Sequence, residues 1–424
     1  MRQKRYNKGV MKEYATIIVG GGASGLFCAA SLLHGNDALL LERGERVGRK
    51  LSATGNGQGN VTNLHMSAGH YFSLRGDPEG VLPRALSRHG ERDMLAFFGN
   101  LGGVFLPDAR GRVYPAGRQA SAVTDLLRFA AAKNGVRTEA ESRVISLKRE
   151  GQGFAVGVQT PAGTKTYRAR RVVLCAGGKA AKNFGTDGSA YALAEGLGHS
   201  VTPLYPSLVQ IRTERSPIRG LKGIRAEAVL SARTEGGRKI AKERGDVIFT
   251  DYGVSGDAAF RLSAFVTDRR EKIFLSLAFL PDLPEEKIAA ALRRKREAFP
   301  ELPAGELLGG IVNNALGRAI ARRCDPDDPG SAARALKNFT LAAEGTLGFD
   351  GAQVTKGGIP LAETDINLQS RFAPGLYFAG EILDVDGECG GYNLQWAYSS
   401  ARTVADAIGR AEAEEKTLKK SSTI

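Results

Sequence analysis

The sequence predicts an α/β protein in which a Rossmann-like domain, built from both ends of the chain, is interrupted by an inserted β-barrel-like domain that carries a small helical subdomain. Two glycine-rich segments indicate this fold, because residues 19–25 and 377–381 each lie at the end of a short apolar run typical of a buried parallel strand. Between them, residues 203–280 change to short strand patterns and residues 281–345 to helical patterns. At 424 residues the chain is long enough for two or three domains.

The first glycine-rich segment has the context of a nucleotide-binding turn. Residues 15–19 predict a buried strand, Gly20-x-Gly22-x-x-Gly25 follows directly, and residues 26–33 predict an apolar helix. Such a turn points the free amides of the helix N-terminus at a pyrophosphate. Gly20 permits the tight turn, Gly22 lets the phosphate approach, and Gly25 lets helix and strand pack closely. We therefore expect pyrophosphate contacts at Gly20, Gly22, Ala23, Ser24 and Gly25.

The next predicted strand, residues 38–41, ends at Glu42, about twenty residues after the first glycine. A carboxylate at this position accepts hydrogen bonds from a ribose diol. Arg43, which follows Glu42, favours a different nucleotide, because a cation at this position sometimes marks a nucleotide with an additional phosphate. A chance glycine match is the other alternative in a chain with 54 glycines, and the strand, helix and acid around the motif argue against it.

A loop rich in small residues follows, over residues 49–63. Ordering so many Gly, Asn and Thr residues is entropically costly, and a linker would not need this alternation. A backbone surface folded against a flat ligand would need it, because Gly tolerates positive φ and Asn amides can bond the ligand. We favour a ligand-binding loop over a linker and expect cofactor contacts at Arg49, Lys50, Leu51, Gly55 and Asn60.

The remaining pattern predicts further elements. The first domain is expected to contain a helix over residues 121–133 with Ser121 as N-cap, a meander of strands over 143–147, 154–159 and 165–169, a parallel strand over 171–174, and a helix over 188–198. The insertion is expected to contain strands over 226–232, 247–250 and 273–277 and helices over 288–299 and 332–342. The chain then returns to the first domain with a strand over 376–378 and a helix from Asn393 to about Gly409.

Composition limits the function classes. The net charge of +14 favours anionic partners, but the basic residues are scattered, so we expect a small-molecule substrate and no nucleic-acid partner. No apolar run is long enough to span a bilayer, so we expect no membrane partner and a cytoplasmic location. The cysteines lie far apart without a CxxC pair, which argues against a disulfide framework, a metal site or a dithiol centre; they are Cys28, Cys175, Cys324 and Cys389.

Taken together, these motifs resemble a flavoprotein family, the dehydro-bile-acid reductase-like and aminoacetone oxidase-like branch of the glutathione-reductase superfamily. The resemblance spans residues 15–408, and its most specific part runs from residue 375 to residue 397. It implies an FAD domain interrupted by a barrel with a helical insert. The chain departs from the family at Gln58-Gly59, where Arg-Cys is usual, and at Asp257, where proline is usual.

The resemblance implies a domain order and several cofactor contacts. We expect a flexible basic tail over residues 1–13, the FAD-binding domain over 14–202 and 354–412, the barrel over 203–280, the helical insert over 281–345, a return segment over 346–353 and a flexible tail over 413–424. The backbone of Val144 is expected at the adenine, and Ala176 and Gly177 beneath the cofactor. Gly380 and Glu381 are expected at the ribityl chain and pyrophosphate.

The helix predicted to start at Asn393 supplies an electronic argument. Reduced flavin carries negative charge around N1 and C2=O, and a buried helix N-terminus aimed there stabilises it by about 1 kcal/mol. Gly391 in the preceding turn permits the approach, and Asn393 and Leu394 offer amides. The alternative is a C-terminal helix that only covers the core, with Asn393 as its N-cap.

No acid–base pair stands out among the side chains, and the candidates for catalysis are Tyr252, Cys389 and Tyr392. A single dinucleotide motif indicates that NAD(P)H, if it is the donor, binds transiently at the flavin. The sequence therefore predicts a tightly bound FAD that passes hydride from NAD(P)H to an activated C=C of a small organic substrate. The alternatives are oxidation of a small amine by oxygen and, in another class, an RNA-binding or RNA-modifying flavoprotein.

Overall fold

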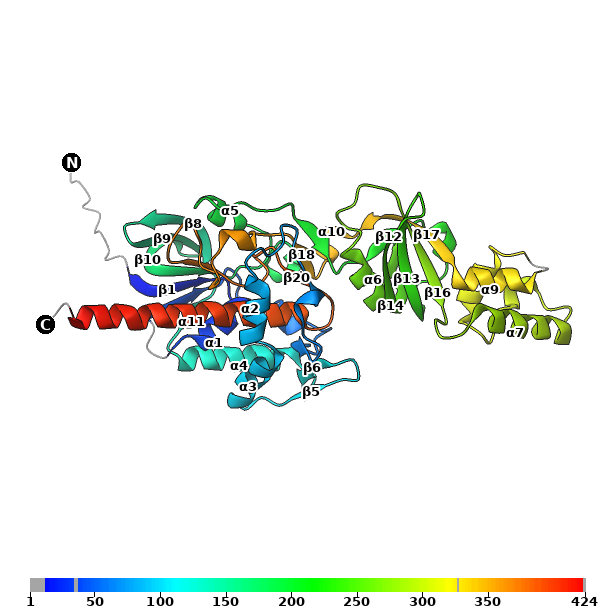
Figure 1. Cartoon of the computed structure of the whole chain (residues 1–424), viewed down its shortest axis with the longest axis horizontal. Helices are drawn as coiled ribbons and strands as arrows, with labels where there is room; N and C mark the ends of the chain where they lie inside the picture. Colours follow the sequence, from blue (N-terminus) through cyan, green and yellow to red (C-terminus); the bar gives the residue numbers. More distant parts are fainter. Residues whose placement is uncertain (1–11, 34–36, 326–327, 422–424) are drawn as a thin grey trace. The chain divides into compact units, whose positions relative to one another are not determined.

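The computed structural model describes residues 12–33, 37–325 and 328–421 and divides the chain into two compact units (Figure 1). The first unit joins the residues up to Leu204 to those from Val354 onward, and the second unit is Tyr205–Gln353. The first unit is therefore made from both ends of the chain. The expected basic tail over residues 1–13 lies outside the described residues up to residue 11, and Glu13 already begins the first strand.

The strands of the first unit are β1 (Glu13–Val19), β2 (Ala38–Leu41), β3 (Thr62–Asn63), β4 (Tyr71–Phe72), β5 (Phe105–Pro107), β6 (Arg112–Pro115), β7 (Arg137–Glu139), β8 (Arg143–Glu150), β9 (Gly153–Thr160), β10 (Gly163–Leu174), β18 (Val354–Lys356), β19 (Leu376–Phe378) and β20 (Asp386–Gly387). Its helices are α1 (Ala23–Ser31), α2 (Val81–Arg88), α3 (Glu91–Asn100), α4 (Ala120–Lys133), α5 (Tyr191–Glu195) and α11 (Tyr392–Ser421).

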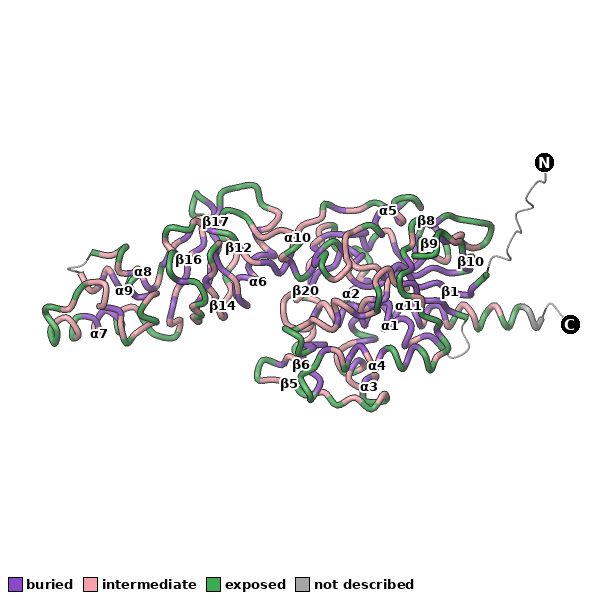
Figure 2. The backbone as a smooth tube through the Cα atoms, turned by 180° about the vertical axis from the view of Figure 1, so that it is seen from behind, coloured by how far each residue is buried: buried purple, intermediate pink, exposed green. Residues whose placement is uncertain are grey.

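The main sheet of the first unit is parallel in the order β7-β2-β1-β10-β19, and β9 and β8 extend it from β10. The centre of the sheet is buried, over Thr16–Val19 of β1, all of β2 and Arg171–Leu174 of β10, and Figure 2 shows this buried centre. Carboxyl ends of parallel strands meet at one edge of a sheet. The residues that follow β1, β10 and β19 therefore lie at the same edge, which confirms the predicted Rossmann-like fold.

Strand β10 corrects the prediction of two separate strands over residues 165–169 and 171–174. It runs unbroken from Gly163 to Leu174 because no Pro or Gly interrupts it after its first residue. Its first half pairs antiparallel with β9, and its second half pairs parallel with β19. Burial follows this change, since residues 166–170 alternate between exposed and buried positions and Arg171–Leu174 are all buried.

Three helix ends differ from the prediction. Helix α4 begins at Ala120 without a side-chain cap, so Ser121 is not its N-cap. Helix α5 is shorter than the predicted 188–198. Helix α11 continues to Ser421, so the predicted flexible tail over 413–424 is wrong up to that residue. Residues 410–418 are rich in Ala and Glu, which favour helix, and the buried Arg171 of β10 pairs with Glu412 and Glu415.

The second unit contains β11 (Tyr205–Ser207), β12 (Ile211–Thr213), β13 (Arg225–Thr234), β14 (Lys239–Phe249), β15 (Gly253–Ser255), α6 (Asp257–Ser263), β16 (Ile273–Phe279), α7 (Glu285–Ala298), α8 (Asn314–Ala321), α9 (Pro329–Lys337), β17 (Phe339–Thr346) and α10 (Gly348–Gly351). Within the described residues, the strands close a barrel in the order β12-β15-β14-β13-β16-β17. Phe249, Phe279 and Phe339 pack in its core with ring centroids 6.2–6.4 Å apart. None of the helices in the described ranges has the length and apolar character needed to cross a membrane.

Strand β17 corrects the predicted helix over residues 332–342. Helix α9 ends at Lys337, and from Phe339 the burial pattern alternates with the period of a strand, with Phe339 and Leu341 inside the barrel. The helical insert therefore ends before residue 339 rather than at 345, and the barrel resumes there rather than at 346. Two adjacent alanines in β17, Ala342 and Ala343, hide the alternation in the sequence.

His199 joins the two sequence halves of the first unit. Its buried imidazole bonds Glu363 through Nδ1 (2.9 Å) and Ser370 through Nε2 (2.7 Å), although the inserted unit separates these partners in the chain. Burial lowers the pKa of His199, and the Glu363 carboxylate opposes part of that change. Protonation of this ring is therefore less favourable in the folded state than in the unfolded chain.

We predict that His199→Ala lowers the free energy of unfolding by about 2–3 kcal/mol at pH 7, because two buried hydrogen bonds are lost. Because the folded-state pKa is depressed, the stabilisation by the neutral ring is present above about pH 6.5 and is lost as the pH falls below it. Urea unfolding of both proteins between pH 5 and 8 measures this. If the difference in unfolding free energy between the two proteins stayed constant from pH 5 to 8, this would contradict the assignment.

Candidate functional site

The turn between β1 and α1 has the geometry that its glycines predict. Gly20 has φ +102°, and a Cβ there would lie 2.7 Å from the Cα of Ala176. A Cβ on Gly25 would lie 1.9 Å from the carbonyl oxygen of Gly20. A Cβ on Gly22 would meet no protein atom within 4 Å. The outer glycines are thus required by the fold, and the middle one faces open space.

The N-terminus of α1 has unused hydrogen-bond donors. Its N-cap, Gly22, provides no side-chain cap. Among the described residues, the backbone amides of Ala23, Ser24 and Gly25 have no acceptor. Free amides together with the positive end of the helix dipole form an anion-binding site, so this turn fits a pyrophosphate.

Glu42 braces the same turn from the end of β2. Its carboxylate oxygens accept the amides of Gly21 and Gly44, both at 2.7 Å. Each oxygen has a second lone pair, so the carboxylate retains acceptor capacity for a ribose. The carbonyl of Glu42 accepts the Ser142 amide, which brings the adjacent edge strand β8, with Val144, to this side of the site.

Arg43 is engaged by a carboxylate. Its guanidinium lies 2.6 Å from Asp187, in the loop before α5. Partial burial raises the pKa of Asp187, but the hydrogen bonds from Arg43 and Ser189 outweigh it and lower that pKa to about 2. The ion pair supplies Arg43 with a counter-charge inside the protein, so its presence does not require a nucleotide with an additional phosphate.

The loop of residues 49–63 lies between the two sequence halves of the unit. Lys50 Nζ donates to Glu381 Oε2 at 2.8 Å, and Glu381 Oε1 accepts the Thr355 amide. Leu51 is buried, Arg49 donates to the Asn183 carbonyl, and Gly55 has φ +59°. The amide group of Asn60 donates to the carbonyls of Thr62 and Val113. Leu51 and Asn60 therefore shape the loop from inside.

The end of β19 lies directly on α1. Gly380 has φ +79°, and a Cβ there would lie 2.6 Å from Ser24 Oγ. The Gly380 amide donates to Ser400 Oγ, and Trp396 Nε1 donates to the Gly380 carbonyl. The Gly380 backbone is thus committed to α11. The next amide, that of Glu381, has no acceptor within the described part of the chain.

The start of α11 packs on the loop of residues 49–63. A Cβ on Gly391 would lie 2.4 Å from the Thr62 carbonyl oxygen, and Thr62 Oγ1 bonds Gln395 at 2.6 Å. Asn393 is not the N-cap, because α11 begins at Tyr392 and the Asn393 side chain instead exchanges hydrogen bonds with the backbone of Gly387. The amides of Asn393 and Leu394 have no acceptor among the residues described.

Two of the three candidates for catalysis lie near this helix start. Tyr392 is buried and stacks on His70, with ring centroids 4.4 Å apart, and Cys389 is half-buried in the preceding turn. Tyr252 belongs to the second unit, in the turn between β14 and β15.

His70 is a neighbour of the site that the sequence does not reveal. Its Nδ1 lies 3.0 Å from Glu388, and the short pairing of β4 with β20 brings the two segments together. Two paired residues leave no periodic pattern from which this contact could be inferred.

All the predicted cofactor-binding residues belong to the first unit, and the two glycine-rich segments meet there. The uncapped amides at the start of α1, the acidic residue at the end of β2 and the glycine approaches at Gly380 and Gly391 fit an elongated dinucleotide. Ala176 and Gly177 follow β10 beside the first turn, as expected from the parallel sheet.

Comparison with known proteins agrees with this geometry. Residues 14–407 match the model of the HI0933-like protein Rossmann domain. The chain is 35% identical to the 3-dehydro-bile acid delta(4,6)-reductase of Clostridium scindens, over 94% of this chain and 98% of the relative. It is 29% identical to the ribosomal RNA dihydrouridine synthase of Escherichia coli, over the same shares of the two chains.

A solved structure shares the fold. The 3-ketosteroid delta1-dehydrogenase of Sterolibacterium denitrificans aligns with a TM-score of 0.50 and 14% identity, covering 94% of this chain and all of that one. With the family match, the relatives and the dinucleotide-shaped turn in place, the chain belongs to the HI0933-like family and is an FAD-dependent oxidoreductase.

Proposed function

We propose that this protein reduces an activated C=C, conjugated with a carbonyl, in a steroid-like substrate, with NADH or NADPH as the reductant. The observation that carries the proposal is the meeting of the Gly20–Gly25 turn, the Gly380 strand end and the start of α11 in one unit. The bile-acid reductase relative, similar over nearly its whole length, supports the substrate class.

The residues that hold FAD in this proposal are mainly backbone groups. The amides of residues 22–25 bind the pyrophosphate, and Glu42 accepts from the adenosine ribose. The backbone of Val144, on the free edge of β8, contacts the adenine. Ala176 and Gly177 line the path beside the first turn, and the Glu381 amide serves the ribityl side.

The start of α11 sets the chemistry. Bound FAD supplies hydride transfer at its isoalloxazine ring. The amides of Asn393 and Leu394 point outward from the positive end of a long helix and stabilise negative charge near them by about 1 kcal/mol. Gly391 permits the close approach, and Asn393 holds the turn in place through Gly387. Tyr392 and Cys389 are the proton-donor candidates nearest to this helix start.

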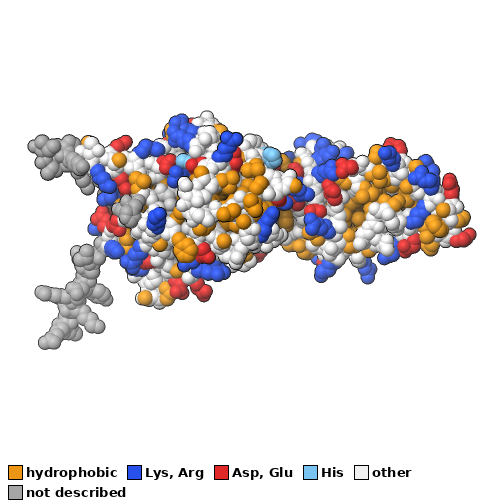
Figure 3. All heavy atoms as spheres, turned by 90° about the horizontal axis from the view of Figure 1, so that it is seen from below, with side chains coloured by type: hydrophobic (Ala, Val, Ile, Leu, Met, Phe, Trp, Pro, Cys, Tyr) orange, Lys and Arg blue, Asp and Glu red, His pale blue; other side chains and the backbone are white. Residues whose placement is uncertain are grey.

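Modification of RNA is a second candidate function, which two observations favour. The net charge is +14, and a relative at 29% identity is named a ribosomal RNA dihydrouridine synthase. Figure 3 shows Lys and Arg side chains interspersed with Asp and Glu on the face drawn, without a single basic stripe. The identity to the bile-acid reductase is higher, and we therefore favour the small-molecule substrate.

Anaerobic mixing tests the reductase proposal. We expect NADH or NADPH to bleach the flavin absorbance of the purified protein, and a 3-keto-4-ene steroid to restore it. A spectrum unchanged by either nicotinamide would count against the proposed donor. Restoration by a ribosomal RNA transcript, but by none of a set of steroid enones, would favour the second candidate.

Two glycine variants test the cofactor site. Gly22→Ala is expected to keep the free energy of unfolding of the apoprotein within about 1 kcal/mol, because its methyl group meets no protein atom and its φ is −77°. Its FAD affinity is expected to fall at least about tenfold, or about 1.4 kcal/mol, because the methyl group lies where the phosphate approaches.

Gly25→Ala is the matched control for a structural effect. Its methyl group would overlap the Gly20 carbonyl, so we expect a loss of about 1–3 kcal/mol in the apoprotein itself. Urea unfolding and fluorescence titration with FAD separate the two effects. A folded Gly22→Ala protein that binds FAD as tightly as the wild type would refute the assignment of this turn.

A further inference from the structure

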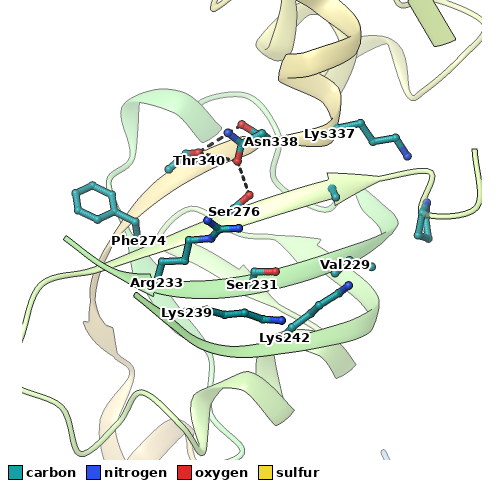
Figure 4. A pocket seen from close by; sticks show the side chains of 12 residues that line it. Val229, Ser231, Arg233, Lys239, Lys242, Phe274, Ser276, Lys337, Asn338 and Thr340 are labelled. Carbon is teal, nitrogen blue, oxygen red and sulfur yellow. Dashed lines mark hydrogen bonds between the residues drawn. The ribbon is translucent and has the colours of Figure 1, made fainter. Parts of the chain in front are cut away.

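The outer surface of the barrel in the second unit contains a pocket of about 650 Å³ (Figure 4). Its lining comes from β13, β14, β16 and β17, from the last residue of α9, and from the segments just before α7 and just after α9. The lining residues are Val229, Ser231, Arg233, Lys239, Lys242, Phe274, Ser276, Ala278, Pro281, Lys337, Asn338 and Thr340. On β13 and β16 they alternate with fully buried core residues, so they belong to the outward face of the sheet.

The pocket is basic and contains no acidic side chain. Arg233, Lys239 and Lys242 have no carboxylate partner among the described residues. Figure 4 shows these three side chains together on neighbouring strands, with Lys337 at the far end of the pocket.

Cations just outside the pocket have carboxylate partners. Arg238 pairs with Glu271, Arg244 with Asp282, and Lys272 with Glu235, at 2.6–3.0 Å. On β13 and β14, the described cations without a carboxylate partner are therefore the three that line the pocket. Their mutual repulsion is relieved when an anion binds.

One neutral side chain beside these cations, that of Asn338, keeps a hydrogen-bond donor for a ligand. Ser276 Oγ donates to Asn338 Oδ1 at 2.6 Å, so the amide nitrogen of Asn338 stays available as a donor. Lys337 Nζ donates to the carbonyls of Phe279 and Leu280, which holds its charge at the rim.

The lining also includes the hydroxyl side chains of Ser231 and Thr340 and four apolar side chains, those of Val229, Phe274, Ala278 and Pro281. The pocket therefore combines these four apolar side chains, its apolar floor, with several cations and a neutral donor. That combination fits an anion with an organic body better than an inorganic ion.

We propose that this pocket binds phosphate groups carried on a nucleotide body. Arg233 provides the planar fork that matches phosphate oxygens, the two lysines provide point charges, and the apolar floor receives the base or sugar. Three unpaired cations balance at least two negative charges. Two sources share this chemistry: a free nucleoside diphosphate and the nucleotides of a single-stranded RNA.

Binding measurements on the FAD-loaded enzyme test the proposal. Isothermal titration calorimetry measures the binding of ADP and of pyrophosphate. Fluorescence anisotropy measures the binding of a fluorescein-labelled single-stranded 12-mer RNA. The pocket variant is Arg233→Gln/Lys242→Gln. The matched control is Arg293→Gln/Arg294→Gln, which removes the same charge from exposed positions of α7 outside the pocket.

We expect the pocket variant to lose at least tenfold in affinity for ADP or for the RNA, and the control to change less than twofold at 150 mM salt. ADP that binds more tightly than pyrophosphate supports the role of the apolar floor. Thermal melting of both variants verifies that they fold, which is expected because the substituted side chains are exposed.

The ADP and RNA measurements distinguish the two possible sources of the phosphate groups. ADP binding without RNA binding identifies a free nucleotide as the ligand, whereas RNA binding that weakens with salt and is lost in the pocket variant identifies the RNA backbone. The proposal would be overturned if the wild type and the pocket variant bound every probe with equal affinity. It would also be overturned if no probe bound at 50 mM salt. These outcomes do not depend on steroid reduction, so either proposal can fail alone.

Discussion

The pairing of β10 on both of its sides is the constraint on which the first unit depends. One side of this strand pairs with β1, and the other pairs with β19, which lies beyond the inserted unit in the sequence. Because all three strands are parallel, their carboxyl ends arrive at one edge in register. The glycine turn, Ala176 and Gly380 are neighbours for this reason, and the contacts of Gly20 with Ala176 and of Gly380 with Ser24 leave no space for a side chain.

In the site at this edge, side chains hold the loops in place and backbone amides are left to bind a ligand. Glu42, Asn60, Asn393 and Lys50 are all hydrogen-bonded to other parts of the protein and hold the loops. The backbone amides without acceptors among the described residues of this site lie at the starts of two helices and at Glu381. A site of this kind is ordered before its ligand arrives, so the ligand does not have to supply the free energy of ordering the loops. It also explains why glycine spacing marks this site better than polar side chains do.

The same division explains what the sequence could and could not predict. The positions of Gly20, Gly25 and Glu42 in the turn were predictable because steric exclusion and a fixed chain distance leave few alternatives. The continuity of β10 was missed because its two halves have different burial patterns. Strand β17 was missed because its Ala residues suit a helix locally, and the barrel overrides that preference. The approach of His70 to Tyr392 depends on a two-residue pairing between distant segments, which no local pattern encodes.

The discontinuity of the first unit has a consequence for synthesis on the ribosome. When residues 205–353 have emerged, the barrel has all of its strands, but β10 still lacks β19 and α1 still lacks α11. Apolar surface of β10 and α1 remains uncovered during that interval, which makes it a target for chaperones or for self-association. The second unit, in the middle of the polypeptide, can therefore fold first. The first unit can be completed only after the C-terminal residues have been synthesised.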